Sequence, residues 1–158
     1  MRDLTRFEDD AFDVVYQPYS INFVDTVEPV FDGVRRVLRP GGLYRLEFAN
    51  PFVMSIDDRD WTEAGYPLRR PYGDGEIEFA TPEWDVHDEA GNYQAVAGPR
   101  EFIHALSTIL NGLAMRSFHL LGLWEFMEPD ENPDPGTWAH YTQIAPPWFS
   151  AWFRLANA

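Results

Sequence analysis

Apolar residues in the first third of the chain form a short run followed by a helical pattern. Phe12–Tyr16 reads FDVVY, a β-branched and aromatic run after an acidic turn, which predicts a buried strand. Apolar side chains then recur at helical spacing from Val27 to Leu38. Either Asp25 or Thr26, immediately before this pattern, is expected to cap the helix.

A turn and a second apolar run follow this helix. Pro40-Gly41-Gly42 is expected to end the helix, and Leu43–Phe48, with the sequence LYRLEF, predicts another strand. Strand, helix and strand joined by short loops form a βαβ unit. We therefore expect two parallel strands joined by a right-handed crossover.

The middle of the chain, residues 51–98, breaks this rhythm because it is rich in Pro, Gly, Asp and aromatic residues. Glu76–Phe79 and Tyr93–Val96 are predicted to pair as an antiparallel hairpin around the turn at 88–92. The segment has too few aliphatic residues for a core of its own. It is therefore interpreted as an insertion or lid rather than a second domain.

The last third, residues 99–158, predicts one helix and two strands. Pro99 is interpreted as an early residue of a helix. The apolar face of that helix comprises Phe102, Ile103, Leu106, Ile109, Leu110 and Leu113. Residues 117–126, SFHLLGLWEF, predict a strand, and Trp148–Leu155 predicts a terminal strand that joins the sheet antiparallel.

Composition and charge narrow the class of protein. A chain of 158 residues, of which 45% are hydrophobic, suits one globular domain. Cysteine is absent, and no apolar run is long enough for a membrane span, so we expect a cytoplasmic protein without a membrane partner. The formal net charge is -14 and all 12 basic residues are arginine, which disfavours nucleic acid as a partner.

Two motifs at matching spacing carry a family resemblance. Phe12-Asp13-Val14-Val15 and the string RVLRPGG at residues 36–42 resemble the fourth strand and the following helix end of class I S-adenosylmethionine-dependent methyltransferases. The similarity is to the type 11 group related to ubiquinone- and menaquinone-biosynthesis enzymes. It implies an α/β fold with a partial Rossmann-like sheet, strands ordered 4-5-7-6 and the last strand antiparallel. Residues 1–50 would form the βαβ core of this single partial domain.

The chain also departs from the family pattern. No G-x-G-x-G loop occurs in the sequence, and its opening, MRDL, resembles the segment after the family's third strand. The resemblance therefore implies that the N-terminal cofactor-binding half is absent and that the FDVVY strand has an open edge. We expect a homo-oligomer or a missing N-terminal segment. Two alternatives remain open: a non-catalytic, self-associating half-domain, or one chain of a two-chain methyltransferase.

The resemblance implies S-adenosylmethionine as cofactor and a small molecule as methyl acceptor. The predicted cofactor-binding residues are Arg2, Asp3, Gln17, Pro18, Tyr19, Ser20 and Phe23. Those of the substrate lid are Trp61, Tyr66, Tyr72 and Trp84. His104 and His140 are candidate general bases, with a structural role as the alternative for each histidine. The lid aromatics could equally form a small core of their own, and Arg2 and Asp3 a frayed terminus.

One acidic cluster has the composition of a metal site. The sequence DVHDE at residues 85–89 offers oxygen ligands to a hard cation. Its spacing matches no known metal-binding loop, so a solvated hairpin turn is the preferred interpretation. The sequence therefore predicts no metal site.

Overall fold

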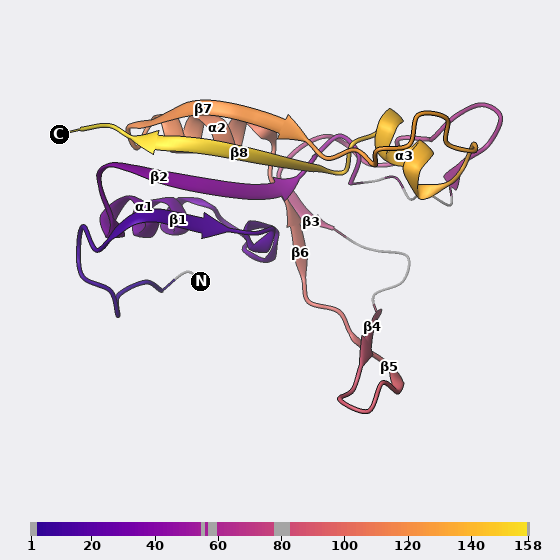
Figure 1. Ribbon diagram of the computed structural model, residues 1–158, viewed down its shortest axis with the longest axis horizontal. Helices are drawn as coiled ribbons and strands as arrows, with labels where there is room; N and C mark the ends of the chain where they lie inside the picture. The colour runs from indigo at the N-terminus through magenta and orange to yellow at the C-terminus, as the bar shows by residue number, and fades with distance from the viewer. Residues whose placement is uncertain (1–2, 55, 57–59, 78–82, 158) are drawn as a thin grey trace.

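A computed structural model describes residues 3–54, 56, 60–77 and 83–157. Its centre is a four-stranded sheet of β1 (Phe12–Gln17), β2 (Leu38–Ala49), β8 (Trp148–Leu155) and β7 (Phe118–Glu125), in that order across the sheet (Figure 1). Strands β1 and β2 run parallel, whereas β8 is antiparallel to both of its neighbours. The predicted strand order, with the last strand antiparallel, is confirmed.

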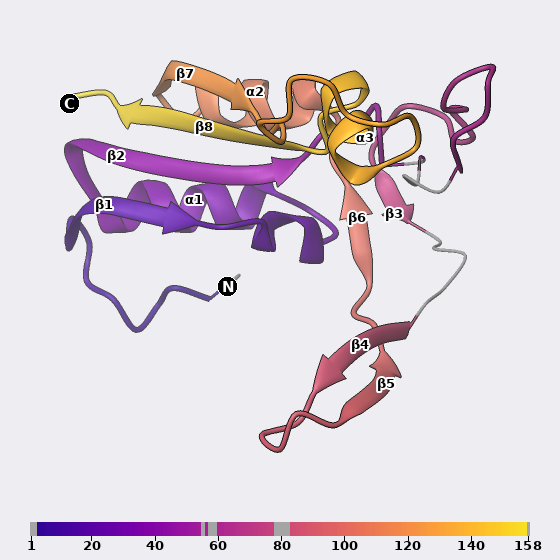
Figure 2. The same cartoon turned by 45° about the vertical axis from the view of Figure 1, so that its right-hand side comes forward.

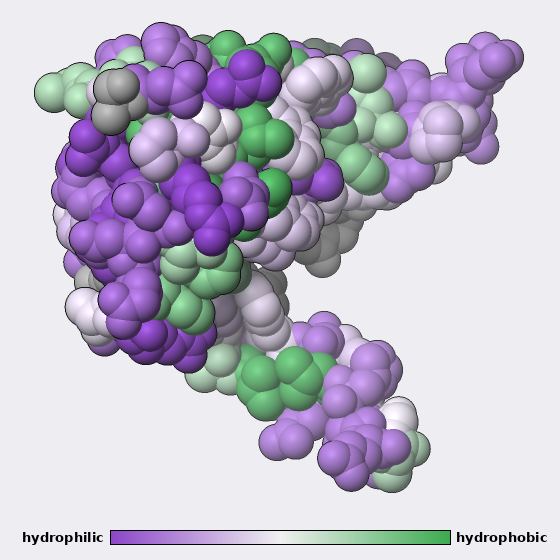
Figure 3. All heavy atoms as spheres, turned by 60° about the vertical axis from the view of Figure 1, so that its left-hand side comes forward, coloured by the Kyte–Doolittle hydropathy of each residue, from purple (hydrophilic) through white to green (hydrophobic). Residues whose placement is uncertain are grey.

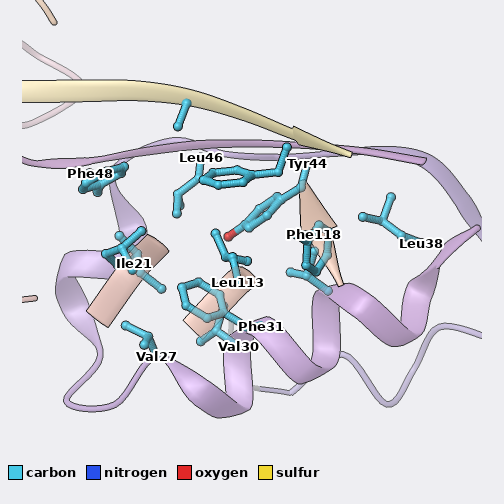
Figure 4. Close-up of a cluster of buried hydrophobic side chains, with 14 of the residues drawn as sticks. Ile21, Val27, Val30, Phe31, Leu38, Tyr44, Leu46, Phe48, Leu113 and Phe118 are labelled. Carbon is cyan, nitrogen blue, oxygen red and sulfur yellow. The ribbon is translucent and has the colours of Figure 1, made fainter. Parts of the chain in front are cut away.

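Two helices cover one face of this sheet. In Figures 1 and 2, α1 (Glu28–Val37) and α2 (Leu106–Ala114) both lie behind the strands. Alternate residues of β2 point towards them, so Tyr44, Leu46 and Phe48 are buried against the helices (Figure 4). Phe31 of α1 and Leu113 of α2 meet these side chains from below. The main core therefore lies between the sheet and the two helices.

The start of α1 differs from the prediction. The residue before the helix is Val27, which has helical backbone angles and makes no side-chain cap, and Pro29 lies in the first turn. Asp25 and Thr26 are not caps; the Thr26 hydroxyl instead donates to Asp25 at 3.3 Å. Proline has no backbone N–H, so the first turn has one fewer donor that needs a cap.

The expected turn after α1 is part of β2. The strand begins at Leu38, and its register with β1 shifts between Phe12↔Leu38 and Val14↔Leu43. Pro40-Gly41-Gly42 therefore forms an irregularity inside the strand rather than a loop. Gly41 has a left-handed φ of 80°, and a Cβ on Gly42 would stand 2.8 Å from the Arg39 carbonyl oxygen.

A hairpin arm projects from one end of the sheet. It consists of β4 (Glu83–His87) paired antiparallel with β5 (Tyr93–Ala97). Figure 3 shows that the arm stands apart from the body and that much of its surface is hydrophilic. At its base, β3 (Gly75–Ile77) pairs with β6 (Glu101–Ile103). The predicted pairing of Glu76–Phe79 with Tyr93–Val96 is therefore wrong, and Phe79 lies outside the described residues.

The other corrections concern helix boundaries. Helix α2 begins at Leu106 and not near Pro99, because Phe102 and Ile103, predicted on its apolar face, belong to β6 and pair with β3. Asp74 accepts hydrogen bonds from the Ala105 N–H and the Thr108 hydroxyl at the helix start, each at 2.8 Å. The described elements that were not predicted are η1 (Ser20–Phe23), the strands β4 and β6, and α3 (Trp138–Ile144). Across the described ranges, no helix combines the length and apolar character needed to cross a bilayer.

Candidate functional site

Tyr19 lies at the carboxyl end of β1, where ligands bind in open α/β sheets. Its backbone is left-handed, with φ 49°, and its ring makes edge contacts with Phe23 and Trp148 at centroid distances of 5.8 and 6.3 Å. The Tyr19 hydroxyl donates to the Glu101 carboxylate at 3.1 Å. A non-glycine residue in this conformation is strained, and these contacts hold it there.

Glu101 is a buried acid that the sequence analysis missed. It lies in β6, 82 positions from Tyr19 in the chain, and is only 5% exposed. Burial raises the pKa of Glu101, and the hydrogen bond from Tyr19 opposes that rise. Burial, together with the charge of Glu101, also raises the pKa of Tyr19. The sequence feature that could have indicated a buried Glu101 is its place directly before the apolar pair Phe102-Ile103 in a short strand.

Beside Tyr19 the surface is hollowed into a pocket of about 440 Å³. The pocket lies on the sheet face opposite the helices, at the end where β2, β7 and β8 approach the loop after β1. Its lining residues are Tyr19, Arg45, Glu47, Trp124, Glu125, Phe126, Trp148, Phe149 and Ser150. This volume falls in the range of small-molecule sites, and most of the lining is aromatic.

A charged network forms the floor of this face. The Arg45 guanidinium pairs with Glu47 at 2.6 Å and lies over the rings of Tyr16 and Trp152, at 4.8 and 5.8 Å from their centroids. The Tyr16 hydroxyl donates to the other Glu47 oxygen at 3.0 Å. Glu47 is therefore satisfied by two donors, and Arg45 is held by one acid and two aromatic faces.

The structure separates the other predicted cofactor residues. Gln17 is buried and accepts a 2.6 Å hydrogen bond from the core residue Tyr44, whereas Asp3 is exposed and accepts from the backbone N–H of Thr5. Arg2 lies outside the described residues. The remaining members of the set stay near Tyr19: Pro18 precedes it, and Ser20 and Phe23 begin and end η1.

His104 is buried behind the same loop. Its Nε2 atom lies 3.2 Å and 3.0 Å from the backbone carbonyl oxygens of Ile21 and Val24, a geometry suited to an N–H donor. Its Nδ1 atom lies 4.0 Å from the Asp74 carboxylate. Burial lowers the pKa of His104, which favours the neutral ring. The imidazole therefore ties η1 to the base of the arm.

His140 belongs to a separate aromatic cluster. Its Nδ1 atom accepts from the Gly136 N–H at 3.2 Å and lies 3.0 Å from the Tyr66 hydroxyl. Trp61 packs against the same imidazole ring at 4.6 Å. Together these contacts attach the segment around residues 61–66 to α3.

The predicted lid aromatics do not share one wall. Trp61 and Tyr66 pack near α3, whereas Tyr72 stacks on Phe52 and its hydroxyl accepts from the Leu106 N–H. Trp84, in the arm, contacts Phe23 at 5.9 Å. These contacts favour the alternative in which the aromatics pack the insertion onto the body. In the part of the chain that the structure describes, no group of three or more His, Asp or Glu residues is placed to hold a metal ion.

The fold and the comparisons with known proteins identify the class of domain. Residues 1–46 match the sequence profile of the methyltransferase domain family. The chain is 31% identical to an uncharacterized methyltransferase, YbaJ, of Bacillus subtilis over 79% of its own length and 47% of that protein. Both matches support a class I S-adenosylmethionine-dependent methyltransferase domain, which the sequence motifs also resemble. The chain spans about half the length of that relative.

Solved structures share the fold. A candidate S-adenosylmethionine-dependent methyltransferase of Listeria monocytogenes superposes with a TM-score of 0.64 at 17% identity, covering 96% of this chain and 64% of that one. The glycopeptide N-methyltransferase MtfA, in complex with S-adenosylmethionine, superposes with a TM-score of 0.52 at 14% identity, covering 94% of this chain and 56% of that one. At sequence identities this low, the structural similarity shows that this chain shares the fold of these proteins.

Proposed function

We propose that this chain carries the acceptor side of an S-adenosylmethionine-dependent methyltransferase site for a small molecule. The observation that carries the proposal is the position of Tyr19. Its ring closes the loop after β1 and also forms one wall of the pocket of about 440 Å³. A donor held at this loop would therefore face an acceptor in the pocket.

The residues around Tyr19 fit the positive end of the cofactor. Aromatic faces attract a cation, and the rings of Tyr19 and Phe23 lie together at the carboxyl end of β1. Ser20 and Pro18, beside them, would complete the wall against the methionine part. When bound, S-adenosylmethionine supplies a methyl group already activated by positive sulfur.

The side chains of this protein would then hold and orient the acceptor. In an in-line displacement, alignment and exclusion of water provide most of the acceleration. Trp148 would contribute to both, because its ring contacts the Tyr19 ring and also forms part of the pocket. We propose that residues 51–98 act as the lid over this site and influence acceptor choice. In support, the Trp84 ring of the arm already contacts Phe23.

Isothermal titration with S-adenosylhomocysteine, the demethylated product, tests the proposal. Saturable one-site binding is expected, and Tyr19→Ala should weaken it by about tenfold through loss of the ring. Met115→Ala, which removes an exposed side chain at the end of α2, is the control and should leave the affinity unchanged. Absence of binding, or equal affinity in the Tyr19→Ala variant, would contradict the proposed site.

A second proposal concerns the open edge of β1. In the described ranges β1 pairs with β2 alone, and Val14 and Tyr16 are 50% and 52% exposed. An exposed apolar edge strand favours pairing with another chain, so we propose self-association through β1 as the non-catalytic alternative. Light scattering should give a mass above that of one chain, and Val14→Lys should reduce it towards 18.3 kDa. A single-chain mass for the unmodified protein would refute this alternative.

A further inference from the structure

The lining of the pocket beside Tyr19 combines aromatic rings with the carboxylates of Glu47 and Glu125. Trp124 and Phe126 of the β7 end are 55% and 40% exposed, so their rings are available to a ligand. Trp148 contacts Phe126 at a centroid distance of 5.3 Å and forms a continuous aromatic wall with it. Such walls offer a ligand both apolar area and negative π faces.

The charged residues that line the pocket determine which ligand charge is favoured there. Arg45 pairs with Glu47 at 2.6 Å, so these two opposite charges of the lining offset each other. Glu125 adds a second carboxylate to the same lining. The formal balance of the lining is therefore negative, and the whole chain, at -14, adds to the attraction of cations.

The geometry points to an apolar amine, bound as its ammonium ion, as the ligand of this pocket. The ammonium would lie near the Glu125 carboxylate and the aromatic faces, with the apolar part against Trp124 and Phe126. A carboxylate ligand would be repelled by the Glu47 and Glu125 carboxylates, and a neutral alcohol would lack the attraction of a cation to the π faces.

As the acceptor, which rests on the proposed methyl transfer, the amine would react through its neutral form. The ammonium first gives one proton to solvent at the open mouth of the pocket. The nitrogen lone pair then forms a bond with the methyl carbon while the carbon–sulfur bond breaks. The electron pair of the broken carbon–sulfur bond stays on sulfur, which becomes neutral. The product is an N-methylated ammonium ion.

A matched set of probes tests the ligand class without cofactor. Phenethylamine, 2-phenylethanol and phenylacetate share one ring and chain length but differ in charge at about pH 7. Titration followed by the indole N–H signals in a nitrogen–proton correlation spectrum should give the tightest binding for phenethylamine, about fivefold tighter than for the alcohol. The Trp124 and Trp148 indole signals should shift. Equal or tighter binding of the alcohol or the acetate, or no shift of these indoles, would overturn the inference.

Two variants sharpen the assignment. Glu125→Gln should reduce the preference for the amine over the alcohol, whereas Glu8→Gln, which removes an equal charge at an exposed position before β1, should leave that preference unchanged. A Glu125→Gln variant with the full preference would refute the role of this carboxylate. Trp124→Leu should weaken both ligands while its other indole signals stay in place, which verifies the fold.

The two proposals fail separately. Binding of S-adenosylhomocysteine without selective amine binding would refute the amine site and leave the methyltransferase proposal standing. Selective amine binding without any binding of S-adenosylhomocysteine would support the pocket and count against methyl transfer by this chain.

Discussion

The two faces of the four-stranded sheet use alternate residues of the same strands but differ in what covers them. On the helix side of β2, Tyr44, Leu46 and Phe48 are almost fully buried. On the other side, Arg45 and Glu47 of the same strand form an ion pair next to aromatic rings. One face is therefore a conventional apolar core, whereas the other is a polar and aromatic surface.

This difference locates the chemistry. Among the described elements, α1 and α2 cover only the first face (Figures 1 and 2), and the candidate pocket beside Tyr19 lies on the second. An arginine fixed between Tyr16 and Trp152 satisfies its charge without a covering helix. The covered face thus determines stability, and the open face carries the candidate pocket.

The largest contrast is expected between neighbouring positions of β2. Leu46→Ala removes a fully buried side chain and should lower the free energy of unfolding by about 2–5 kcal/mol. Arg45→Ala, one residue earlier but on the open face, should cost about 1 kcal/mol or less. Urea unfolding followed by circular dichroism measures both. Similar losses at the two positions would contradict the division into a core face and an open face.

A second test concerns the irregular start of β2. Gly42→Ala should destabilise by about 1–3 kcal/mol, because the new methyl group would press on the Arg39 carbonyl oxygen. Gly73→Ala is the matched control, since nothing lies within 4 Å of the place that its methyl group would take. Thermal unfolding of the two variants should therefore separate them. If Gly42→Ala keeps the stability of the unmodified protein, the close approach of Gly42 to the Arg39 carbonyl oxygen is not needed for the start of β2.

The third test uses pH at the buried acid. Because burial raises the pKa of Glu101 above its ordinary value of 4.5, the folded state favours the protonated form. The stability that Glu101 contributes is therefore complete below pH 4.5 and is lost as pH rises through the folded pKa. Glu101→Gln stays neutral, so it should gain stability relative to the unmodified protein as pH rises. A constant difference from about pH 4 to 8, measured by urea unfolding, would argue against a buried carboxylate.

The smallest effect is expected on the open face. Tyr16→Phe removes the hydrogen bond to Glu47 but keeps the ring over Arg45. Since Tyr16 is about half exposed, the free energy of unfolding should change by less than about 1 kcal/mol. Tyr44→Phe is the counterpart on the buried face and should cost more, because it leaves the Gln17 side chain without its 2.6 Å donor. Thermal unfolding compares the two. Equal costs would weaken the contrast between the faces.

The strands that the sequence predicted correctly share strong local signals. β1, β7 and β8 are apolar runs bounded by turn residues, and each was placed to within a residue or two. Their order in the sheet followed from the family motifs. Helix α3 was missed because it has only seven residues in a Pro-rich region, where the Thr137 cap and contacts to Trp61 and Tyr66 stabilise it.

The candidate site was only partly predictable. The loop after β1 was expected at the ligand-binding end of the sheet, and Tyr19 lies there. Glu101 and Trp148, which hold Tyr19, could not be assigned to it, because 82 and 129 residues separate them from it in the chain. The pocket likewise depends on β8 bringing Trp148 beside the ends of β2 and β7.

The sequence by itself determined which segments form the strands and the helix of the βαβ unit, because hydrophobic periodicity is a local property. It did not determine the exposure of β1, where Val14 and Tyr16 are half exposed in a strand that was predicted to be buried. Only the tertiary structure decided that Glu101 is buried, that Tyr19 is strained and that aromatic residues from distant segments surround one pocket. These properties arise from contacts between segments far apart in the chain, and a side chain's burial and partners depend on where the backbone of other segments lies.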